Sequence, residues 1–353
     1  MNSRLGIVAS LGLVATSATA DVLNVPADYP TIQSAIVAAV AGDEVLVAAG
    51  TYFEAIDLLG KAVTLRGAAG AESTIINGTG LDTSVIRCAS GEGAETLIAG
   101  FTITRGVAGS PIPGQPGFRF GGGLFVKDAS PTIEACRFID NRAGFGGGAY
   151  FLRSESVIRD CLFHDNLANT DGGGAQFFDG AVSIEDCMFT LNKAPQGHGG
   201  GAHFVIGLPT VTDCTFSNNN ATVGGGFSFF TNGSAMAATG LAVNSNIASG
   251  TGGGIWLNVG ADQLLLSGSE VCSNFPNPIS GDYIDLGKNL FCTGCPGDLN
   301  NNGIIDGADI SVMLGFWGFS GIGIPVPADL DNDGVVSGSD LATLLSNWGS
   351  CGS

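Results

Sequence analysis

Two segments near the C-terminus carry oxygen-bearing side chains at the spacing of a calcium-binding loop. The first runs from Asp298 to Asp309 and the second from Asp329 to Asp340. In such loops, side chains at positions 1, 3, 5 and 12, in some loops also position 9, and the backbone carbonyl at position 7 offer oxygen to Ca²⁺, and glycine at position 6 makes the turn. The expected ligands are Asp298, Asn300, Asn302, Ile304, Asp306 and Asp309, then Asp329, Asp331, Asp333, Val335 and Asp340. The chain is therefore predicted to bind two Ca²⁺ ions.

The two loops belong to a duplicated unit. Matching positions are displaced by 31 residues, and the same displacement relates Trp317 to Trp348. Each loop leads into a short apolar segment that is predicted to form a helix, and the two helices are expected to share a small core. The expected core residues are Ile310, Met313, Leu314, Leu341, Leu344 and Leu345. An Asn- and Asp-rich linker, the alternative, explains neither the loop spacing nor the helices.

This duplicated loop and helix resembles a type I dockerin over residues 295 to 353. Both loops end in aspartate, which also suits that family. The resemblance implies calcium-dependent folding and docking onto a cohesin-like partner, usually in assemblies that degrade polysaccharides. Loop positions 10 and 11 are Gly307-Ala308 and Gly338-Ser339, in place of the paired hydroxyl residues often found there.

A second candidate for chemistry is the pair Asp171 and His198. The tripeptides Asn169-Thr170-Asp171 and Gly197-His198-Gly199 resemble those that carry a catalytic aspartate and a supporting histidine in polygalacturonases. The Asp-Asp and Arg-x-Lys motifs of that family are missing. A repeated glycine corner also generates such strings by chance, so a catalytic pair and a by-product of the repeat both stay open.

The elements that position this pair follow from a repeat of about 25 residues. Glycine triplets begin at Gly121, Gly146, Gly172, Gly199, Gly224 and Gly252, and each triplet after the first is preceded by a Phe-x-x-Asn or Val-x-x-Asn pattern such as Phe138 to Asn141. This period and the short β-prone segments predict a right-handed parallel β-helix solenoid with three strands and three corners per turn. A helix starting after Thr31 is expected to cap its N-terminal end.

The repeat resembles the pectin-lyase-type right-handed β-helix. Its pairing of Gly-Gly-Gly with Phe-x-x-Asn also resembles the repeats of chlamydial polymorphic outer-membrane proteins over roughly residues 120 to 275. The membrane barrel that ends that family is absent from this sequence, so surface anchoring by autotransport is not expected.

One column of the repeat is a candidate glycan-binding strip. It contains Phe125, Tyr150, Gln176, His203, Ser228 and Trp256. The column lies between two apolar columns, so strand alternation predicts that its side chains point outward. Exposed aromatic rings beside polar groups suit stacking on sugars, and the alternative is scattered or loop-covered surface aromatics.

The N-terminus predicts export. Arg4, the apolar stretch from Leu5 to Ala15 and the small residues Ala18 to Ala20 match a signal peptide over residues 1–20. No other stretch is long and apolar enough to be a transmembrane helix. The net charge of −19 argues against nucleic acid and anionic membranes as partners. We expect a bacterial secreted or cell-surface protein with the β-helix over residues 21–293 and the dockerin-like module over residues 294–353.

The nine cysteines fall into two groups. Cys136, Cys161, Cys187 and Cys214 form one interior column, and its outer members are too far apart to share a zinc ion, so reduced core thiols are predicted. Cys88 is also expected to be buried and free. Cys295 and Cys351 bracket the C-terminal module and are expected to form a disulfide in an exported protein, with Cys272 and Cys292 as a second candidate pair.

Together these features predict a secreted protein that engages an extracellular polysaccharide through the β-helix and docks through the calcium-dependent module. A polysaccharide lyase or glycoside hydrolase is one alternative, supported by the resemblance to the β-helix family. A surface adhesin or matrix protein is the other, supported by the Gly-Gly-Gly and Phe-x-x-Asn repeats.

Overall fold

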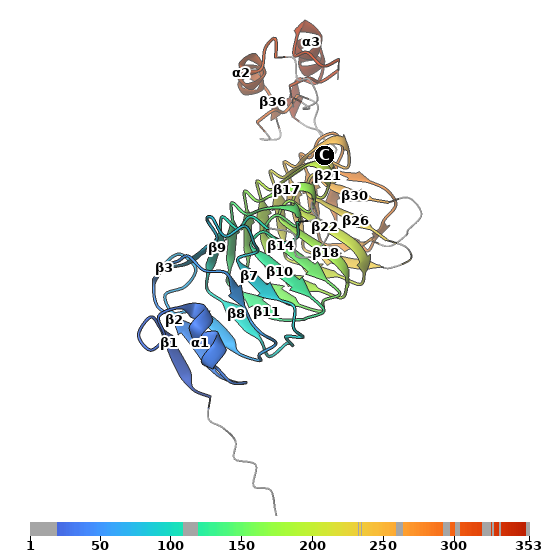
Figure 1. Cartoon of the computed structure of the whole chain (residues 1–353). Helices are drawn as coiled ribbons and strands as arrows, with labels where there is room; N and C mark the ends of the chain where they lie inside the picture. The colour runs from blue at the N-terminus through green and yellow to red at the C-terminus, as the bar shows by residue number, and fades with distance from the viewer. Residues whose placement is uncertain are drawn as a thin grey trace, which may run out of the picture.

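A computed structural model describes residues 20–108, 119–231, 233, 235–258, 264–291, 297–300, 304–319, 326, 328–331 and 333–350. Its main body is a solenoid of short strands, in which each strand pairs in parallel with its counterpart on the next turn. Figure 1 shows the turns stacked along one axis. The predicted all-β parallel β-helix is confirmed.

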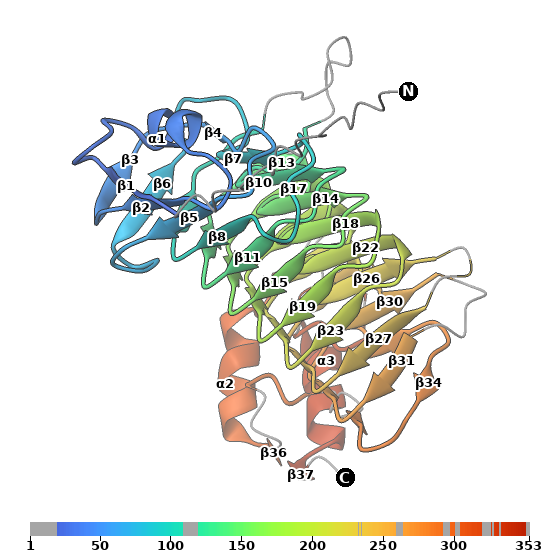
Figure 2. The same ribbon diagram turned by 90° about the horizontal axis from the view of Figure 1, so that it is seen from below.

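The solenoid has four parallel sheets. The 11-stranded sheet, whose strands lie side by side in Figure 2, contains β1 (Val22–Val25), β2 (Glu44–Val47), β5 (Thr64–Gly67), β8 (Leu97–Ala99), β11 (Thr132–Glu134), β15 (Val157–Arg159), β19 (Ser183–Glu185), β23 (Thr210–Thr212), β27 (Met236–Thr239), β31 (Leu264–Ser267) and β34 (Ile284–Asp285). The 10-stranded sheet contains β3 (Gly50–Tyr52), β6 (Thr74–Asn77), β9 (Thr102–Thr104), β12 (Arg137–Ile139), β16 (Leu162–His164), β20 (Met188–Thr190), β24 (Thr215–Ser217), β28 (Ala242–Asn244), β32 (Glu270–Cys272) and β35 (Leu290–Phe291).

The other two sheets flank the glycine triplets. The 5-stranded sheet precedes them and contains β13 (Arg142–Phe145), β17 (Leu167–Asp171), β21 (Lys193–His198), β25 (Asn220–Val223) and β29 (Ile247–Thr251). The 9-stranded sheet contains β4 (Ile56–Asp57), β7 (Ile86–Cys88), β10 (Leu124–Lys127), β14 (Ala149–Leu152), β18 (Ala175–Gly180), β22 (Ala202–Gly207), β26 (Phe227–Phe230), β30 (Ile255–Leu257) and β33 (Ile279–Ser280).

The 5-stranded sheet is a difference from the predicted three strands per turn. The residues between the asparagine column and the glycine triplet are extended and pair with the next turn, so the central turns have four strands. The corner that follows admits only glycine. A Cβ on Gly201 would lie 2.5 Å from the carbonyl oxygen of Gly226 and 2.9 Å from the ring of Phe216. The glycine triplets therefore allow successive corners to stack closely.

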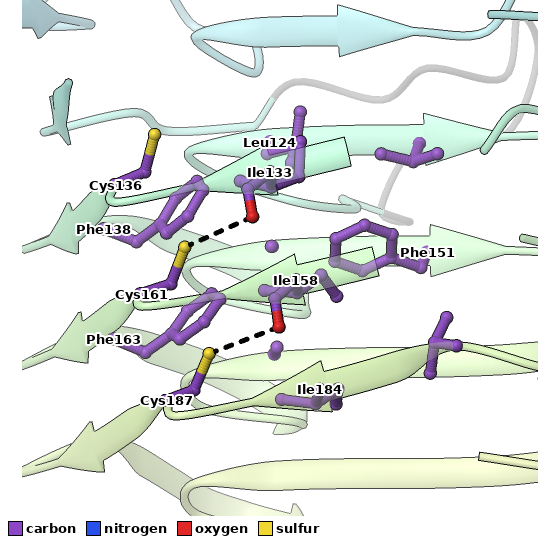
Figure 3. Close-up of a cluster of buried hydrophobic side chains, with 14 of the residues drawn as sticks. Leu124, Ile133, Cys136, Phe138, Phe151, Ile158, Cys161, Phe163, Ile184 and Cys187 are labelled. Atoms are coloured by element: carbon purple, nitrogen blue, oxygen red, sulfur yellow. Dashed lines mark hydrogen bonds between the residues drawn. The ribbon is translucent and has the colours of Figure 1, made fainter. Parts of the chain in front are cut away.

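Like residues stack inside the solenoid. The rings of Phe163 and Phe189 are nearly parallel with centroids 4.6 Å apart, and Phe216 follows at 4.8 Å. Figure 3 shows Cys136, Cys161 and Cys187 of the cysteine column beside Phe138 and Phe163, with the Cys161 thiol directed at the carbonyl of Ile133. The thiols of Cys88, Cys136, Cys161, Cys187 and Cys214 are free and buried, which confirms the predicted core thiols.

The asparagine column of the repeat forms a buried hydrogen-bonded ladder. The side-chain amide of Asn166 donates to the Oδ1 of Asn192 at 3.0 Å, and Asn192 donates to Asn219 in the same way. The residue before the asparagine has a left-handed backbone, such as Asp165 with φ 49° and Asn218 with φ 56°. The asparagines are thereby free to direct their amides along the stack.

Helix α1 (Ile32–Ala38) confirms the predicted N-terminal cap. Thr31 is its N-cap, and its hydroxyl oxygen accepts a hydrogen bond from the backbone of Ser34. Ile32 and Ile36 are fully buried against the first turns, whereas Val40 is exposed because the helix ends before it. Among the described residues, none of the helices has the length and apolarity needed to cross a bilayer.

The C-terminal module has its own small core. Its described elements are α2 (Gly307–Gly315), α3 (Gly338–Ser346) and the antiparallel pair β36 (Ile304–Ile305) and β37 (Gly349–Ser350). Met313 and Leu344 are fully buried, as predicted, and Ile310 and Leu341 pack against them. Leu314 and Leu345 were expected in this core but are exposed, because each follows the buried position by one residue and so points to another face of its helix.

Candidate functional site

Two columns of side chains face each other across the glycine triplets, and we call them together the glycine-corner surface. The first column precedes the triplets and contains Phe120, Phe145, Asp171, His198, Val223 and Thr251. The second follows them and contains Phe125, Tyr150, Gln176, His203, Ser228 and Trp256. Each turn contributes one residue to each column, so neighbouring turns form a continuous line along the solenoid.

The second column is the predicted glycan-binding strip, and its expected exposure is wrong for most members. Its buried members are Phe125, Tyr150, Gln176, His203 and Ser228, whereas Trp256 is partly exposed. The side chains do point away from the core, but the tight corner brings the first column against them. The ring centroid of Phe120, for example, is 4.6 Å from that of Tyr150. The exposed part of this surface is therefore the first column together with Trp256.

Asp171 and His198 make direct contact, as their adjacent turns predicted. The Oδ1 atom of Asp171 accepts a hydrogen bond from the His198 backbone N–H at 2.8 Å and lies 3.0 Å from His198 Nδ1. Burial raises the pKa of Asp171, but the hydrogen bonds from His198 and the charge of nearby His203 outweigh it, so that pKa lies below its ordinary value of 3.8. Asp171 is therefore a carboxylate at neutral pH, ready to orient the imidazole.

His203 completes a three-residue cluster. Its ring centroid is 5.5 Å from that of His198, and its Nδ1 lies 2.7 Å from the hydroxyl oxygen of Ser228. Burial lowers the pKa of His203 from 6.5 to about 4, against the opposing charge of Asp171. The Trp256 ring reaches across from two turns away, with its centroid 5.3 Å from that of His198. The sequence predicts Asp171 and His198 as a candidate catalytic pair and His203 as part of a separate glycan-binding strip. The fold joins the pair and the strip.

A third column, which the sequence analysis missed, presents open apolar surface. It occupies the outer face of the 9-stranded sheet and contains Leu152, Phe178, Val205 and Phe230 in register. The side chains of Phe178 and Phe230 are 37% and 45% exposed. Counting two residues onward from Tyr150 along the alternating strand would have found it. Nearby, Arg153 pairs with Asp128 at 2.6 Å and 2.8 Å on the edge of a hollow of ≈ 550 Å³.

Three of the ligands predicted for the second calcium loop lie close together. One carboxylate oxygen from each of Asp329, Asp331 and Asp333 lies within 4.8 Å of the others. The Asp340 carboxylate is fully buried and accepts hydrogen bonds from the backbone N–H groups of Leu330 at 2.6 Å and of Ser337 at 2.7 Å. Oxygen atoms from three aspartates thus converge within one loop, while the Asp340 carboxylate is held by backbone N–H groups of the same loop. The carbonyl of Val335 belongs to the same loop and is the fifth predicted ligand.

The first loop repeats the backbone hydrogen bonds to its last aspartate. Asp309 is fully buried and accepts hydrogen bonds from the backbone N–H groups of Leu299 at 2.7 Å and of Asp306 at 2.8 Å. The Asp306 side chain caps helix α2 by accepting from the backbone of Ala308. The remaining predicted ligands are Asp298, Asn300 and Ile304, which are described, and Asn302, which lies outside the described residues.

Of the four cysteines predicted to form disulfides, only Cys272 lies within the described residues. Cys295 and Cys351, and likewise Cys292, lie outside the described residues. Cys272 is disulfide-bonded, which agrees with its assignment to a bridge in the sequence analysis.

One family model matches part of the solenoid, and several solved structures resemble the chain at low sequence identity. A family model for the right handed beta helix region matches residues 117–271. Among solved structures, a pectin methylesterase from Aspergillus niger is 15% identical over 78% of this chain and 90% of that chain, with a TM-score of 0.43. Pectin methylesterase from carrot is 14% identical over 79% and 88% of the two chains, with a TM-score of 0.42. Comparison with curated proteins gives no significant match.

Proposed function

We propose that this chain is an exported protein whose β-helix engages an extracellular polysaccharide along the outer face of the 9-stranded sheet. The observation that carries this proposal is the presence of two exposed rings on that face and of partly exposed rings at the glycine corner beside it. Trp256 and His198 lie at the glycine corner, and Phe178 and Phe230 lie further along the strands. Aromatic rings offer flat apolar surface to sugar rings, while the polar cluster between them offers hydrogen bonds.

The stacking of turns suits a polymer in particular. Phe178 and Phe230 are two turns apart in register, so their rings are separated by roughly 10 Å along the solenoid axis. A chain of sugars that lies parallel to this axis meets a comparable side chain at every turn. The repeat therefore favours an extended ligand over a single small molecule.

Binding to a polysaccharide panel tests this proposal. The double variant Phe178→Ala/Phe230→Ala and the variant Trp256→Ala are expected to weaken binding about 3- to 10-fold each, as follows from roughly 1 kcal/mol for a lost aromatic contact. The control is Phe53→Ala, which removes an exposed ring from outside this face. Equal binding by all three variants would overturn the assignment of the face, and no binding by the wild-type protein would overturn the glycan proposal.

A polysaccharide lyase or glycoside hydrolase is the second candidate, and the contact between Asp171 and His198 favours it. A carboxylate that holds an imidazole by Nδ1 leaves Nε2 to take a proton from a substrate or water. Release of unsaturated or reducing sugar from polyuronates would establish turnover. Asp171→Asn and His198→Ala should each abolish it, while His164→Ala, on another sheet, should not. Activity that survived both changes would exclude this pair, and glycan binding without turnover would favour an adhesin or matrix role.

We further propose that the C-terminal module folds around two Ca²⁺ ions and attaches the protein to a cohesin-like partner. The converging carboxylates of the second loop support calcium binding because Ca²⁺ prefers oxygen ligands. Chelation should remove the helical circular dichroism of α2 and α3 and leave the β-helix signal. Asp329→Ala should remove one of the two bound ions. Capture by immobilised cohesins in Ca²⁺ but not in chelator would support docking, and no capture by any cohesin would reject it.

A further inference from the structure

Asp171, His198 and His203 form a compact group with mixed nitrogen and oxygen donors. One ligand atom of each residue lies within 4.8 Å of the other two. The chain contains only three histidines, and two of them belong to this group. We propose that these three residues bind a divalent transition-metal ion such as Zn²⁺, at a site separate from the calcium loops.

The donor types select the class of metal. Two imidazole nitrogens and one carboxylate oxygen suit Zn²⁺ and its transition-metal neighbours, whereas Ca²⁺ is bound by oxygen alone. Donor atoms about 2.0 to 2.2 Å from a common ion are about 3 to 3.6 Å from each other. Asp171 Oδ1 and His198 Nδ1 are 3.0 Å apart. The side chain of His198 is 41% exposed, so it can move. Such a movement would bring the more widely separated donor atoms within this range.

A second residue holds His203 in the orientation that metal binding requires. Its Nδ1 is 2.7 Å from the fully buried hydroxyl of Ser228. When Nδ1–H donates to this oxygen, the lone pair of the ring is on Nε2. Metal-binding histidines are commonly oriented by such a hydrogen bond from the other ring nitrogen. Ser228 is therefore a positioning residue of the proposed site.

An unsatisfied buried oxygen provides an independent indication of a ligand. Gln176 lies on the same turn as Asp171, and its backbone is in register with that of His203. Its side-chain oxygen is buried and has no hydrogen-bond partner among the described residues. Buried polar atoms nearly always have a partner. A water molecule bound to the ion, or the ion itself, would supply one.

Titration of the full-length protein with Zn²⁺, in saturating Ca²⁺ to fill the C-terminal loops, tests the site. Calorimetry is expected to detect one Zn²⁺ per chain, and Co²⁺ should give visible absorption bands from nitrogen ligation. His198→Ala should weaken Zn²⁺ binding at least 10-fold and Ser228→Ala about 10- to 100-fold. The matched control His164→Ala should bind Zn²⁺ like the wild-type protein.

Two outcomes would overturn the proposal. One is the absence of Zn²⁺ binding by the wild-type protein in saturating Ca²⁺. The other is unchanged Zn²⁺ binding by both His198→Ala and His203→Gln, with folding of each variant verified by thermal unfolding. The result is independent of the proposed function, because metal binding is measured without polysaccharide and glycan binding can be measured in chelator.

Discussion

The Nδ1 atom of His203 lies 2.7 Å from the hydroxyl oxygen of Ser228 on the next turn, and both residues are buried. This pair holds a titratable ring in a place that water does not reach. Outward-pointing residues of a solenoid are ordinarily solvated, so the burial comes from the corner, which stacks the ring of His198 on that of His203 with centroids 5.5 Å apart. Stability should therefore depend on the protonation of His203.

Stability is predicted to fall as the pH is lowered from about 6.5 to about 4. Burial lowers the folded-state pKa of His203 to about 4, so in this range the unfolded chain binds a proton that the folded protein does not. The loss is on the order of 3 kcal/mol in the free energy of unfolding. Urea unfolding across this pH range measures it. His203→Gln should flatten the dependence, and an unchanged pH profile in that variant would refute the assignment.

The stacked rings should dominate the stability of the central turns. Phe189 is fully buried between Phe163 and Phe216, with ring centroids 4.6 Å and 4.8 Å away. Phe189→Ala is expected to lower the free energy of unfolding by about 3 to 5 kcal/mol. Met188→Ala, at the exposed neighbouring position, should change it by less than about 0.5 kcal/mol. Similar losses of unfolding free energy in the two variants would show that ring stacking does not cause the destabilisation.

The asparagine ladder should tolerate no apolar replacement. Asn192 donates to the Phe163 carbonyl at 2.8 Å and to Asn219, and it accepts from Asn166. Asn192→Leu leaves several buried groups unsatisfied and is expected to cost roughly 3 kcal/mol or more in chemical denaturation. Lys193→Ala, an adjacent exposed change, serves as the control. Equal midpoints for both variants would contradict a structural role of the ladder.

The buried thiols should be unreactive in the folded protein. Burial raises the pKa of Cys136 to about 12, and the pKa values of Cys187 and Cys214 are raised as well, chiefly by their thiol neighbours in the column. Thiolate is the reactive form, so modification by a disulfide reagent is expected only after unfolding. Counting reactive thiols in native and denaturing buffer measures this. Rapid labelling of the native protein would mean that the column opens readily.

Several features could be predicted from the sequence because they depend on identical residues meeting along one axis. The columns of Phe, Asn, Cys and Gly predict the solenoid, since stacking places each residue on its own copy. The same reasoning predicted the contact of Asp171 with His198 and the capping helix after Thr31. Calcium binding by the two C-terminal loops stays a prediction from local spacing, and Asp340 accepts backbone hydrogen bonds within its own loop.

Other features depend on the angle at which the chain turns at the glycine triplets. The pattern of residue types along the sequence does not predict this angle. Strand alternation predicts that Tyr150 points outward. Only the folded corner brings Phe120 against Tyr150 and so buries the Tyr150 side chain. The same corner joins His203 to Asp171 and His198, and it leaves Phe178 and Phe230 as the open rings of the sheet. Repetition along the axis was thus determined by the sequence, whereas exposure and the grouping of side chains across the axis were decided by the tertiary structure, because they depend on contacts between strands that face different directions.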